Sequence, residues 1–291
     1  SGEEGEVSGN IIAKNSLPLD RIKDITSQLY NPNILINGNF SINQRGTEFT
    51  NVKDYTSDRW YFASFDVNDS SGKGKISFIN NQCIITNFNN TQNYIIQPIE
   101  TKTAQQLCGK YVTLSAYIKV ENATKGSVFI QLVGDNNVDS MWGENEVKII
   151  KTEIYDCLNI NEYTLCKLTT IIPEDIKTLC VTTGSHIDYG KGMPDNTAKV
   201  YIKNVKLELG SVATPFVPRL YCEELDLCQR YYCRVKISQN LITSNDKQIL
   251  VNLKIPKNMR INPTAVFDTD AYFHNLSDGN AILIKHKGDS P

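Results

Sequence analysis

The sequence predicts a mainly β protein: an antiparallel β-sandwich with a short N-terminal stalk helix and a small C-terminal domain of one helix and a few strands. Runs of alternating apolar and polar residues recur at short intervals between turn residues, which is typical of a sandwich. Apolar residues recur at helical spacing at 19–29 and again at 220–234. These patterns place the expected domains at residues 1–30, 31–218 and 219–291.

The N-terminal helix is expected from the stripe Leu19, Ile22, Ile25 and Leu29, with Asp20 near its start. A helix of about three turns is marginal alone in water, so the stripe needs a partner surface. It either packs on its own domain or forms a stalk with copies of itself.

The sandwich is expected to begin with a strand at residues 34–36, followed by a turn or bulge at Asn37-Gly38. Its clearest strand spans residues 111–120, where an apolar face alternates with a polar one. Further strands are expected at residues 75–88, 94–99, 127–133, 165–172, 176–182 and 201–209.

The closing strand of the sandwich changes phase. Its apolar parity shifts between Ile202 and Val205, which predicts a β-bulge near Lys203-Asn204. A Gly- and Pro-bounded corner follows at residues 210–218.

The expected C-terminal domain opens with a helix at residues 220–234. Its apolar stripe is Tyr221, Leu225, Cys228 and Tyr232. The charges that complement the helix dipole are Glu223 and Glu224 in the first turn and Arg230 and Arg234 in the last. Short strands are expected at residues 249–255, 264–267 and 281–285.

Composition removes several classes of function. The chain has 291 residues, a net charge of −2 and a pI near 6.0, which argues against nucleic-acid binding through clustered Lys and Arg. No apolar run approaches the roughly 18 residues of a membrane span. Of the 8 cysteines, Cys83, Cys166 and Cys180 lie in apolar runs, so we expect mostly free thiols.

No residue pattern predicts catalysis, a metal site or a cofactor. The three histidines, His186, His274 and His286, stand in no H-E-x-x-H pattern, and no G-x-S-x-G elbow occurs. Helical geometry disperses Cys222, Cys228 and Cys233, which is poor for tetrahedral zinc. Carboxylates from distant strands could still converge, but nothing singles out a pair.

Two long polar loops, residues 134–146 and 184–196, are the candidates for ligand contact, because loops on a rigid scaffold carry function. Aromatic rings among amides and carboxylates suit sugar or protein contact. The candidate residues are Asp135, Asn137, Trp142, Glu144, His186, Asp188 and Tyr189. The alternative is that Trp142 and Tyr189 pack against the edge of the sandwich.

Trp60, within the aromatic run Trp60-Tyr61-Phe62, has two interpretations. It is either a platform for sugar stacking or a core residue. The core interpretation is favoured, because buried aromatic rings dominate protein cores.

Four stretches together resemble the receptor-binding tail fibres of bacteriophages and of phage-tail-like bacteriocins. They read NILINGNFSINQRG at residues 33–46, YTSDRW at 55–60, ELGSVATPF at 208–216 and CQRYY at 228–232. The resemblance implies a jelly-roll sandwich similar to carbohydrate-binding modules. It implies attachment to a bacterial surface through a glycan or surface protein, without enzymatic activity. The alternatives are a carbohydrate-binding module or glycan-degrading enzyme, and a purely structural part of the particle.

The same resemblance implies partners and a location. It implies a homotrimer, contact with other tail proteins through the N-terminal end, and a place in the virion tail after assembly in the reducing host cytoplasm. A second apolar patch on the C-terminal helix, Leu227 and Tyr231, offers a surface for a neighbouring copy. The modules it resembles often hold a structural calcium. Here Asn39 and Asn204 stand where an acidic ligand is expected, so we expect no bound metal.

Overall fold

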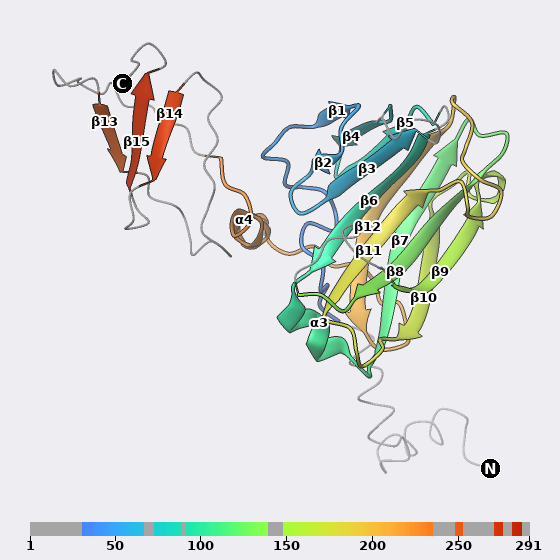
Figure 1. The fold of residues 1–291 in the computed structure, drawn as a ribbon. Coiled ribbons are helices and arrows are strands. Elements are labelled where there is room, and N and C mark those ends of the chain that lie inside the picture. Colours follow the sequence, from blue (N-terminus) through green and yellow to red (C-terminus); the bar gives the residue numbers. More distant parts are fainter. Residues whose placement is uncertain are drawn as a thin grey trace, which may run out of the picture. The chain divides into compact units, whose positions relative to one another are not determined.

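The computed structural model describes residues 31–66, 73–88, 91–138 and 148–234, and the backbone of three strands at 248–252, 271–275 and 281–286. The chain divides into two compact units, Ser1–Pro218 and Arg219–Pro291. In the described part of the first unit, two antiparallel sheets stack face to face (Figure 1). The chain passes repeatedly between the sheets, as in a jelly roll, which confirms the predicted mainly β sandwich.

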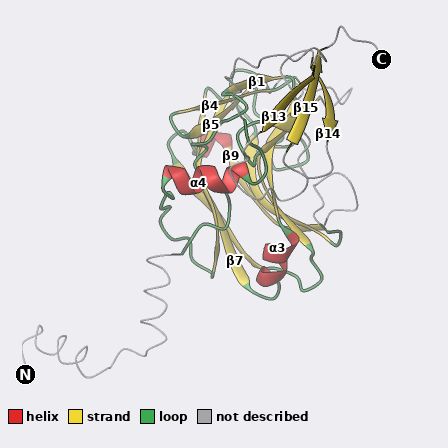
Figure 2. Cartoon of the chain, turned by 90° about the vertical axis from the view of Figure 1, so that its left-hand side faces the viewer, coloured by secondary structure: helices red, strands yellow, loops and turns green. Residues whose placement is uncertain are grey.

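The described strands of the first unit form two six-stranded sheets in which all strand pairs are antiparallel. The first sheet has the order β1 (Glu48–Thr50), β4 (Lys75–Ile79), β5 (Gln82–Thr86), β12 (Lys199–Leu209), β7 (Tyr111–Glu121), β10 (Thr164–Ile171). The second has the order β2 (Asp54–Tyr55), β3 (Tyr61–Asp66), β6 (Thr91–Ile99), β11 (Thr178–Ser185), β8 (Ser127–Asp135), β9 (Lys148–Asp156). A short helix, α3 (Thr101–Leu107), lies at one end of the sandwich (Figure 2).

The main core lies between the two sheets. Strand β7 supplies the residues expected from its alternation, all at most 2% exposed: Val112, Leu114, Ala116, Ile118 and Val120. Trp60 is fully buried in the same core, which confirms its core interpretation. Full burial of each large apolar side chain stabilises the fold by about 1.5–3 kcal/mol relative to exposure.

The bulge predicted in the closing strand is confirmed. Lys203 pairs with Tyr117 and Lys206 pairs with Ser115, so β12 holds one extra residue between them. Asn204 takes the left-handed conformation there, with a φ of 53°. The extra residue restores the inward face of β12, since Val205 and Leu207 are buried with Val200 and Ile202.

The strand predicted at residues 34–36 is wrong, because the structure has no strand there. The side chain of Gln97 takes the place of a neighbouring strand. Its Oε1 accepts from the Ile36 backbone N–H at 2.8 Å, and its Nε2 donates to the Ile36 oxygen at 2.7 Å. The backbone groups of this segment are therefore satisfied without a strand ladder.

Residues 33–38 are instead bound to the bulge of β12. The side chain of Asn33 accepts from the Leu207 N–H at 3.0 Å and donates to the Val205 oxygen at 2.9 Å. The Val205 N–H donates to the Gly38 oxygen at 2.8 Å. A Cβ on Gly38 would lie 2.2 Å from the Val205 oxygen, so this close approach requires glycine.

The YTSDRW stretch packs on the same segment. Asn37, fully buried with a φ of 57°, donates its side-chain N–H groups to the Ile42 and Asp58 oxygens and to the Ser57 hydroxyl. Trp60 Nε1 donates to the Asn37 oxygen at 2.8 Å. The opening motif, YTSDRW and the bulge of β12 thus form one hydrogen-bonded framework, here called the motif framework.

The edge of β10 is covered by side chains of β9. The Tyr155 hydroxyl donates to the Lys167 oxygen at 3.0 Å and accepts from the Lys167 N–H at 2.8 Å. Lys151 Nζ donates to the Thr169 oxygen at 3.2 Å. The backbone groups of the β10 edge at Lys167 are therefore occupied.

In the second unit, α4 (Tyr221–Gln229) is shorter than the predicted helix, and Arg230 lies at its C-cap. The predicted apolar stripe is wrong at its first position, because Tyr221 is 65% exposed and the buried residues are Glu224 and Cys228. Arg219 Nη1 pairs with the buried Glu224 carboxylate at 3.0 Å and so compensates its charge. The acidic first turn is confirmed, but the predicted basic last turn is wrong, because α4 ends at Gln229 and both Arg230 and Arg234 come after it.

The distal sheet of the second unit has the order β13 (Gln248–Asn252), β15 (Ala281–His286), β14 (Ala271–Asn275). It contains two of the strands expected near the C-terminus, β13 and β15. The strand expected at 264–267 and the helix expected at 19–29 lie outside the described residues, as do Trp142 and Glu144.

Free thiols are confirmed at Cys83, Cys108, Cys157, Cys166 and Cys222. Burial raises the pKa of Cys83 well above its ordinary value, and raises the pKa of Cys157 and of Cys166 to about 12. Thiols this far from ionisation are inert packing groups. Cys180, on the outer side of the second sheet, is buried as well.

Candidate functional site

Two of the predicted site residues, Asp135 and Asn137, form a turn at the end of β8. Asp135 Oδ1 accepts from the Asn137 backbone N–H at 2.7 Å and from its side-chain N–H at 2.8 Å. The Thr178 hydroxyl donates to the Asn137 oxygen at 2.7 Å. Asp135 is only 6% exposed, so both side chains serve the turn in this arrangement.

Three other predicted residues, His186, Asp188 and Tyr189, lie together at the opposite end of β8 and β11. Phe129 pairs with Gly184 at that end, whereas Asp135 pairs with Thr178 at the other. Six residues of strand separate the two ends, or about 20 Å. The structure therefore divides the five predicted residues that it describes between two places.

The second place is an aromatic cluster on the outer face of the second sheet, here called the His186 cluster. It consists of Phe65, Tyr94, Phe129, His186 and Tyr189. The ring of Tyr189 lies 4.8 Å from that of His186 and 4.9 Å from that of Phe129. Gln131 donates to the Tyr189 hydroxyl at 2.8 Å. Tyr189 thus packs on the outer face of the second sheet, against β8.

His186 is the titratable member of this cluster. Burial lowers its pKa, while the carboxylate of Asp188 raises it; the net shift is downward. Asp188 Oδ2 lies 3.4 Å from His186 Nδ1 and is itself exposed. The imidazole is therefore a largely desolvated group with one exposed carboxylate beside it.

A second surface lies on the outer face of the first sheet, and no sequence pattern pointed to it. This Tyr163 patch consists of Lys119 and Glu121 on β7, Tyr201 and Lys203 on β12, and Tyr163 in the loop before β10. Lys203 Nζ lies 3.6 Å from the centre of the Tyr163 ring. Lys119 Nζ lies 4.9 Å from the centre of the Tyr201 ring and 5.4 Å from that of Tyr163.

Hydrogen bonds hold the members of the Tyr163 patch in place. Glu121 accepts from Lys119 Nζ at 2.6 Å and from the Tyr201 hydroxyl at 2.8 Å, and these bonds lower its pKa. The Tyr163 hydroxyl donates to Gln82 on β5. Burial raises the pKa of Tyr163 and of Tyr201, so both phenols stay neutral donors. The patch is a partly exposed, preorganised set of rings and charges.

The corner after β12 packs on the same sheet face at the end of β12. Lys206 and Glu208, at most 2% exposed, form an ion pair at 3.1 Å. The Thr214 N–H and hydroxyl donate to the Glu208 carboxylate, and Lys206 donates to the Pro215 oxygen. A buried ion pair thus holds the ELGSVATPF stretch in place, and the two charged side chains also bond backbone groups of that stretch.

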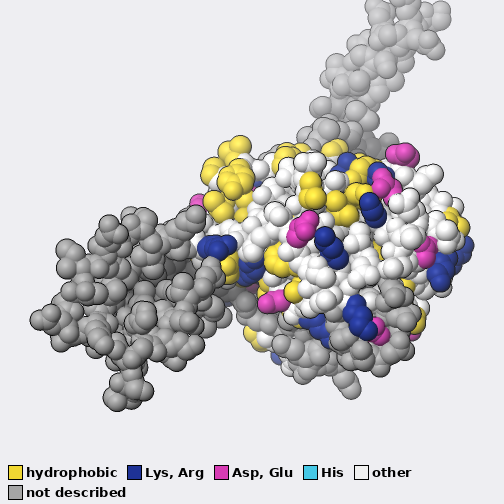
Figure 3. All heavy atoms as spheres, turned by 90° about the horizontal axis from the view of Figure 1, so that it is seen from above, with side chains coloured by type: hydrophobic (Ala, Val, Ile, Leu, Met, Phe, Trp, Pro, Cys, Tyr) yellow, Lys and Arg dark blue, Asp and Glu magenta, His cyan; other side chains and the backbone are white. Residues whose placement is uncertain are grey.

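The described residues contain no group of three or more His, Cys, Asp or Glu that could hold a metal. Asn204 lies in the bulge, and Asn39 accepts from the Ser41 N–H at 3.4 Å. In the part of the chain that the structure describes, no helix is long and apolar enough to cross a membrane. Figure 3 shows Lys and Arg interspersed with Asp and Glu on the face it presents.

No family model and no curated protein matches the chain. Among solved structures, a CBM4 domain is similar at 12% identity and a TM-score of 0.39, over 60% of this chain and 98% of that one. A tripod from the baseplate of bacteriophage Tuc2009 is similar at 18% and 0.34, over 66% of this chain and 60% of that one. An enzymatically active domain of tailspike protein 4 of bacteriophage CBA120 is similar at 12% and 0.32, over 61% of this chain and 21% of that one. Similarities this low assign neither ligand nor activity.

Proposed function

We propose that this chain is the receptor-binding protein of a phage or phage-tail-like particle, which attaches the particle to a bacterial surface through a glycan or a surface protein. The observation that carries the proposal is the motif framework. The Asn33 side chain and the Leu207 N–H that donates to it are 174 positions apart in the sequence. Two of the stretches that resemble tail fibres thus meet at β12, the strand that leads directly into a third, and this favours a shared framework over separate coincidences.

The motif framework itself is a scaffold. Its central residues Asn37 and Trp60 are fully buried and their polar groups are bonded within the unit. Ligand contact is therefore proposed on surfaces that these motifs leave exposed, chiefly the Tyr163 patch and the 184–196 loop. Fold alone does not decide what such surfaces bind.

Binding to cells tests the proposal directly. Fluorescently labelled full chain is incubated with intact bacteria, with isolated cell walls, and with walls stripped of either polysaccharide or protein. We expect saturable binding to some strains, lost with one of the two treatments. Absence of binding to every strain and wall fraction would contradict attachment. Release of reducing ends from wall polysaccharide would instead favour the glycan-degrading alternative.

We further propose that the protein is a homotrimer located in the virion tail, joined to other tail proteins through its N-terminal end. Three copies would present each binding surface three times to a repetitive cell envelope, which raises effective affinity without new contacts. Light scattering coupled to size exclusion should give about three times the 32.7 kDa monomer mass. A monomer mass at micromolar concentration would contradict the trimer. A trimer that survives deletion of residues 1–30 would move the interface to the later domains.

A further inference from the structure

The Tyr163 patch carries an excess of positive charge in a protein of net charge −2. Lys119 is paired with Glu121, and Lys199, directly opposite Glu121 on β12, also acts electrostatically on that carboxylate. Lys203 contacts the Tyr163 ring, and among the described residues no carboxylate lies within ion-pair distance of its Nζ. Lys119 and Lys199 thus act on the Glu121 carboxylate, whereas the Lys203 ammonium lies over the Tyr163 ring.

The position of Lys203 over the Tyr163 ring favours recognition of a charged ligand over stacking of a neutral sugar. Sugar stacking needs an open ring face, but Lys203 Nζ already occupies a face of Tyr163 at 3.6 Å. A cation over a ring at an exposed site is held by about 0.5–1 kcal/mol, which positions the ammonium without neutralising it. The patch therefore offers a fixed positive charge rather than an empty aromatic platform.

The ring that positions Lys203 is itself fixed from two sides. Its hydroxyl donates to Gln82 on β5, and Lys119 approaches it from β7. On β12, Tyr201 is held by its hydrogen bond to Glu121. Both phenol hydroxyls already donate within the protein, so the donor offered to a ligand is the Lys203 ammonium, and charge-assisted hydrogen bonds from an ammonium to carboxylate or phosphate are the strong ones.

We propose that the Tyr163 patch binds an anionic glycan through a carboxylate or phosphate group. Lys203 would donate to this group, and Lys119 and Tyr201 would lie beside it. This inference rests on the proposed function for its claim that the glycan belongs to a bacterial surface. Lys203 supplies the unpaired positive charge, and Tyr163 is a positioning residue that holds the ammonium in place.

Three defined probes test the charge requirement on the full chain by calorimetry: an oligogalacturonate for carboxylates, a glycerol phosphate oligomer for phosphates, and a neutral galactan oligomer. We expect binding of at least one anionic probe, weakened by added salt, and none of the neutral probe. The anionic probe that binds identifies the acidic group. Neutral binding as tight as anionic binding, or binding of none of the three, would overturn the proposal.

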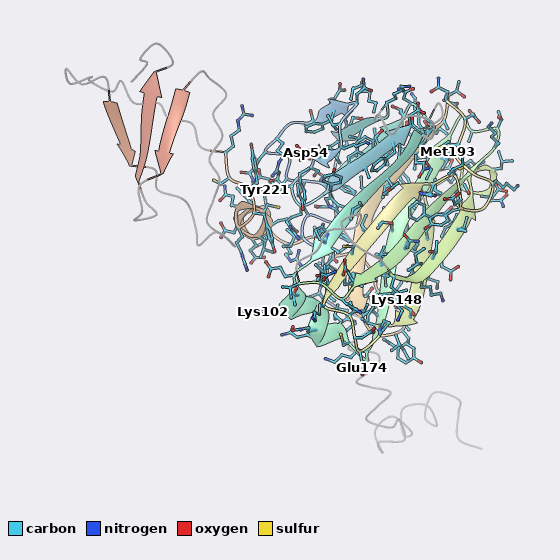
Figure 4. All side chains as sticks on the ribbon, in the orientation of Figure 1. Asp54, Lys102, Lys148, Glu174, Met193 and Tyr221 are labelled. Atoms are coloured by element: carbon cyan, nitrogen blue, oxygen red, sulfur yellow. The ribbon has the colours of Figure 1, made fainter. Side chains whose placement is uncertain are left out.

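Lys203→Met tests the site, because it keeps the length of the side chain and removes the charge. We expect about threefold to tenfold weaker binding of the anionic probe, the scale of one exposed charged contact. Lys203→Arg should retain binding. The matched control is Lys102→Met on α3, at the opposite end of β7, where Figure 4 labels Lys102. Equal weakening by the two Met variants would contradict the assignment.

Tyr163 variants separate positioning from general stability. Tyr163→Phe keeps the ring beneath Lys203, whereas Tyr163→Leu removes it, so only the second should weaken the anionic probe as strongly as Lys203→Met does. Thermal unfolding of each variant confirms that the sandwich is intact. Cell binding that is insensitive to Lys203→Met would contradict this inference and leave the proposed function standing. Probe binding at the patch without any cell binding would contradict the proposed function and leave an anion-binding patch.

Discussion

Trp60 and Asn37 are joined by a hydrogen bond of 2.8 Å from the indole Nε1 to the backbone oxygen, inside a fully buried environment. Trp60→Phe removes the donor and part of the ring, so we expect a loss of about 2–3 kcal/mol in the free energy of unfolding, measured with denaturant. Tyr111→Leu, at a position 55% exposed, should change it by less than about 0.5 kcal/mol. A Trp60→Phe protein as stable as the wild type would contradict the contribution of this buried hydrogen bond and ring.

Gly38 should not tolerate a side chain. A Cβ there would lie 2.2 Å from the Val205 oxygen and break the contact between the opening segment and the bulge of β12. We expect Gly38→Ala to cost about 2–3 kcal/mol of stability, as overpacking of a rigid site does. Gly192→Ala is the control, because its Cβ would meet nothing closer than 3.7 Å and only its φ of +75° is strained. Equal costs for the two variants would show that the clash at Gly38 is relieved by a small backbone shift.

The buried Lys206–Glu208 pair should behave as a unit. Lys206→Met leaves the Glu208 carboxylate buried without its cation, which typically costs about 3–5 kcal/mol. The double variant Lys206→Met/Glu208→Gln should cost less than the sum of the two single variants, which a double-mutant cycle of chemical unfolding would measure. Lys75→Met, in an exposed pair with Glu48 at 3.3 Å, should cost less than about 1 kcal/mol. Additive costs at Lys206 and Glu208 would contradict their coupling.

His186 should make stability depend on pH. Burial lowers its pKa in the folded state below the ordinary value of 6.5, so the unfolded chain binds the proton more readily. Its contribution is complete above pH 6.5 and is lost as the pH falls from 6.5 towards the lowered pKa. Unfolding of wild type and of His186→Gln, measured from about pH 7 to pH 5, should give a smaller loss in the variant. His274 and His286 are present in both proteins, so their effects cancel in the difference. Identical profiles would mean that His186 is not desolvated.

The sequence allowed the sandwich to be predicted where a strand alternates strictly. Strand β7 and the bulge at Lys203–Lys206 could be predicted from the alternation of apolar and polar residues alone. A shift of the strand pairing by one residue would expose the whole inner face, so the alternation has to match the register. Helix α3 was missed because Thr101–Leu107 is too short to display a period. Strand β9 was missed because none of its residues is fully buried, so its apolar positions form no clean alternation.

Side-chain contacts that replace backbone pairing could not be predicted at all. The hydrogen bonds between the Ile36 backbone and the Gln97 side chain join residues 61 positions apart, and no local sequence pattern predicts them. The Tyr163 patch was missed for a similar reason. Its tyrosines and lysines occupy alternate polar positions on three separate segments, and each segment alone looks like an ordinary solvated face. Only strand order brings them together.

The covered edge of β10 has a consequence for how copies of this protein can join. The Tyr155 hydroxyl is hydrogen-bonded to both the N–H and the oxygen of Lys167, which are the backbone groups that an added strand would pair with. A foreign peptide or a neighbouring subunit cannot extend the sheet at that point unless the Tyr155 side chain is displaced. Neighbouring copies of this sandwich are therefore protected at Lys167 from joining into a continuous sheet.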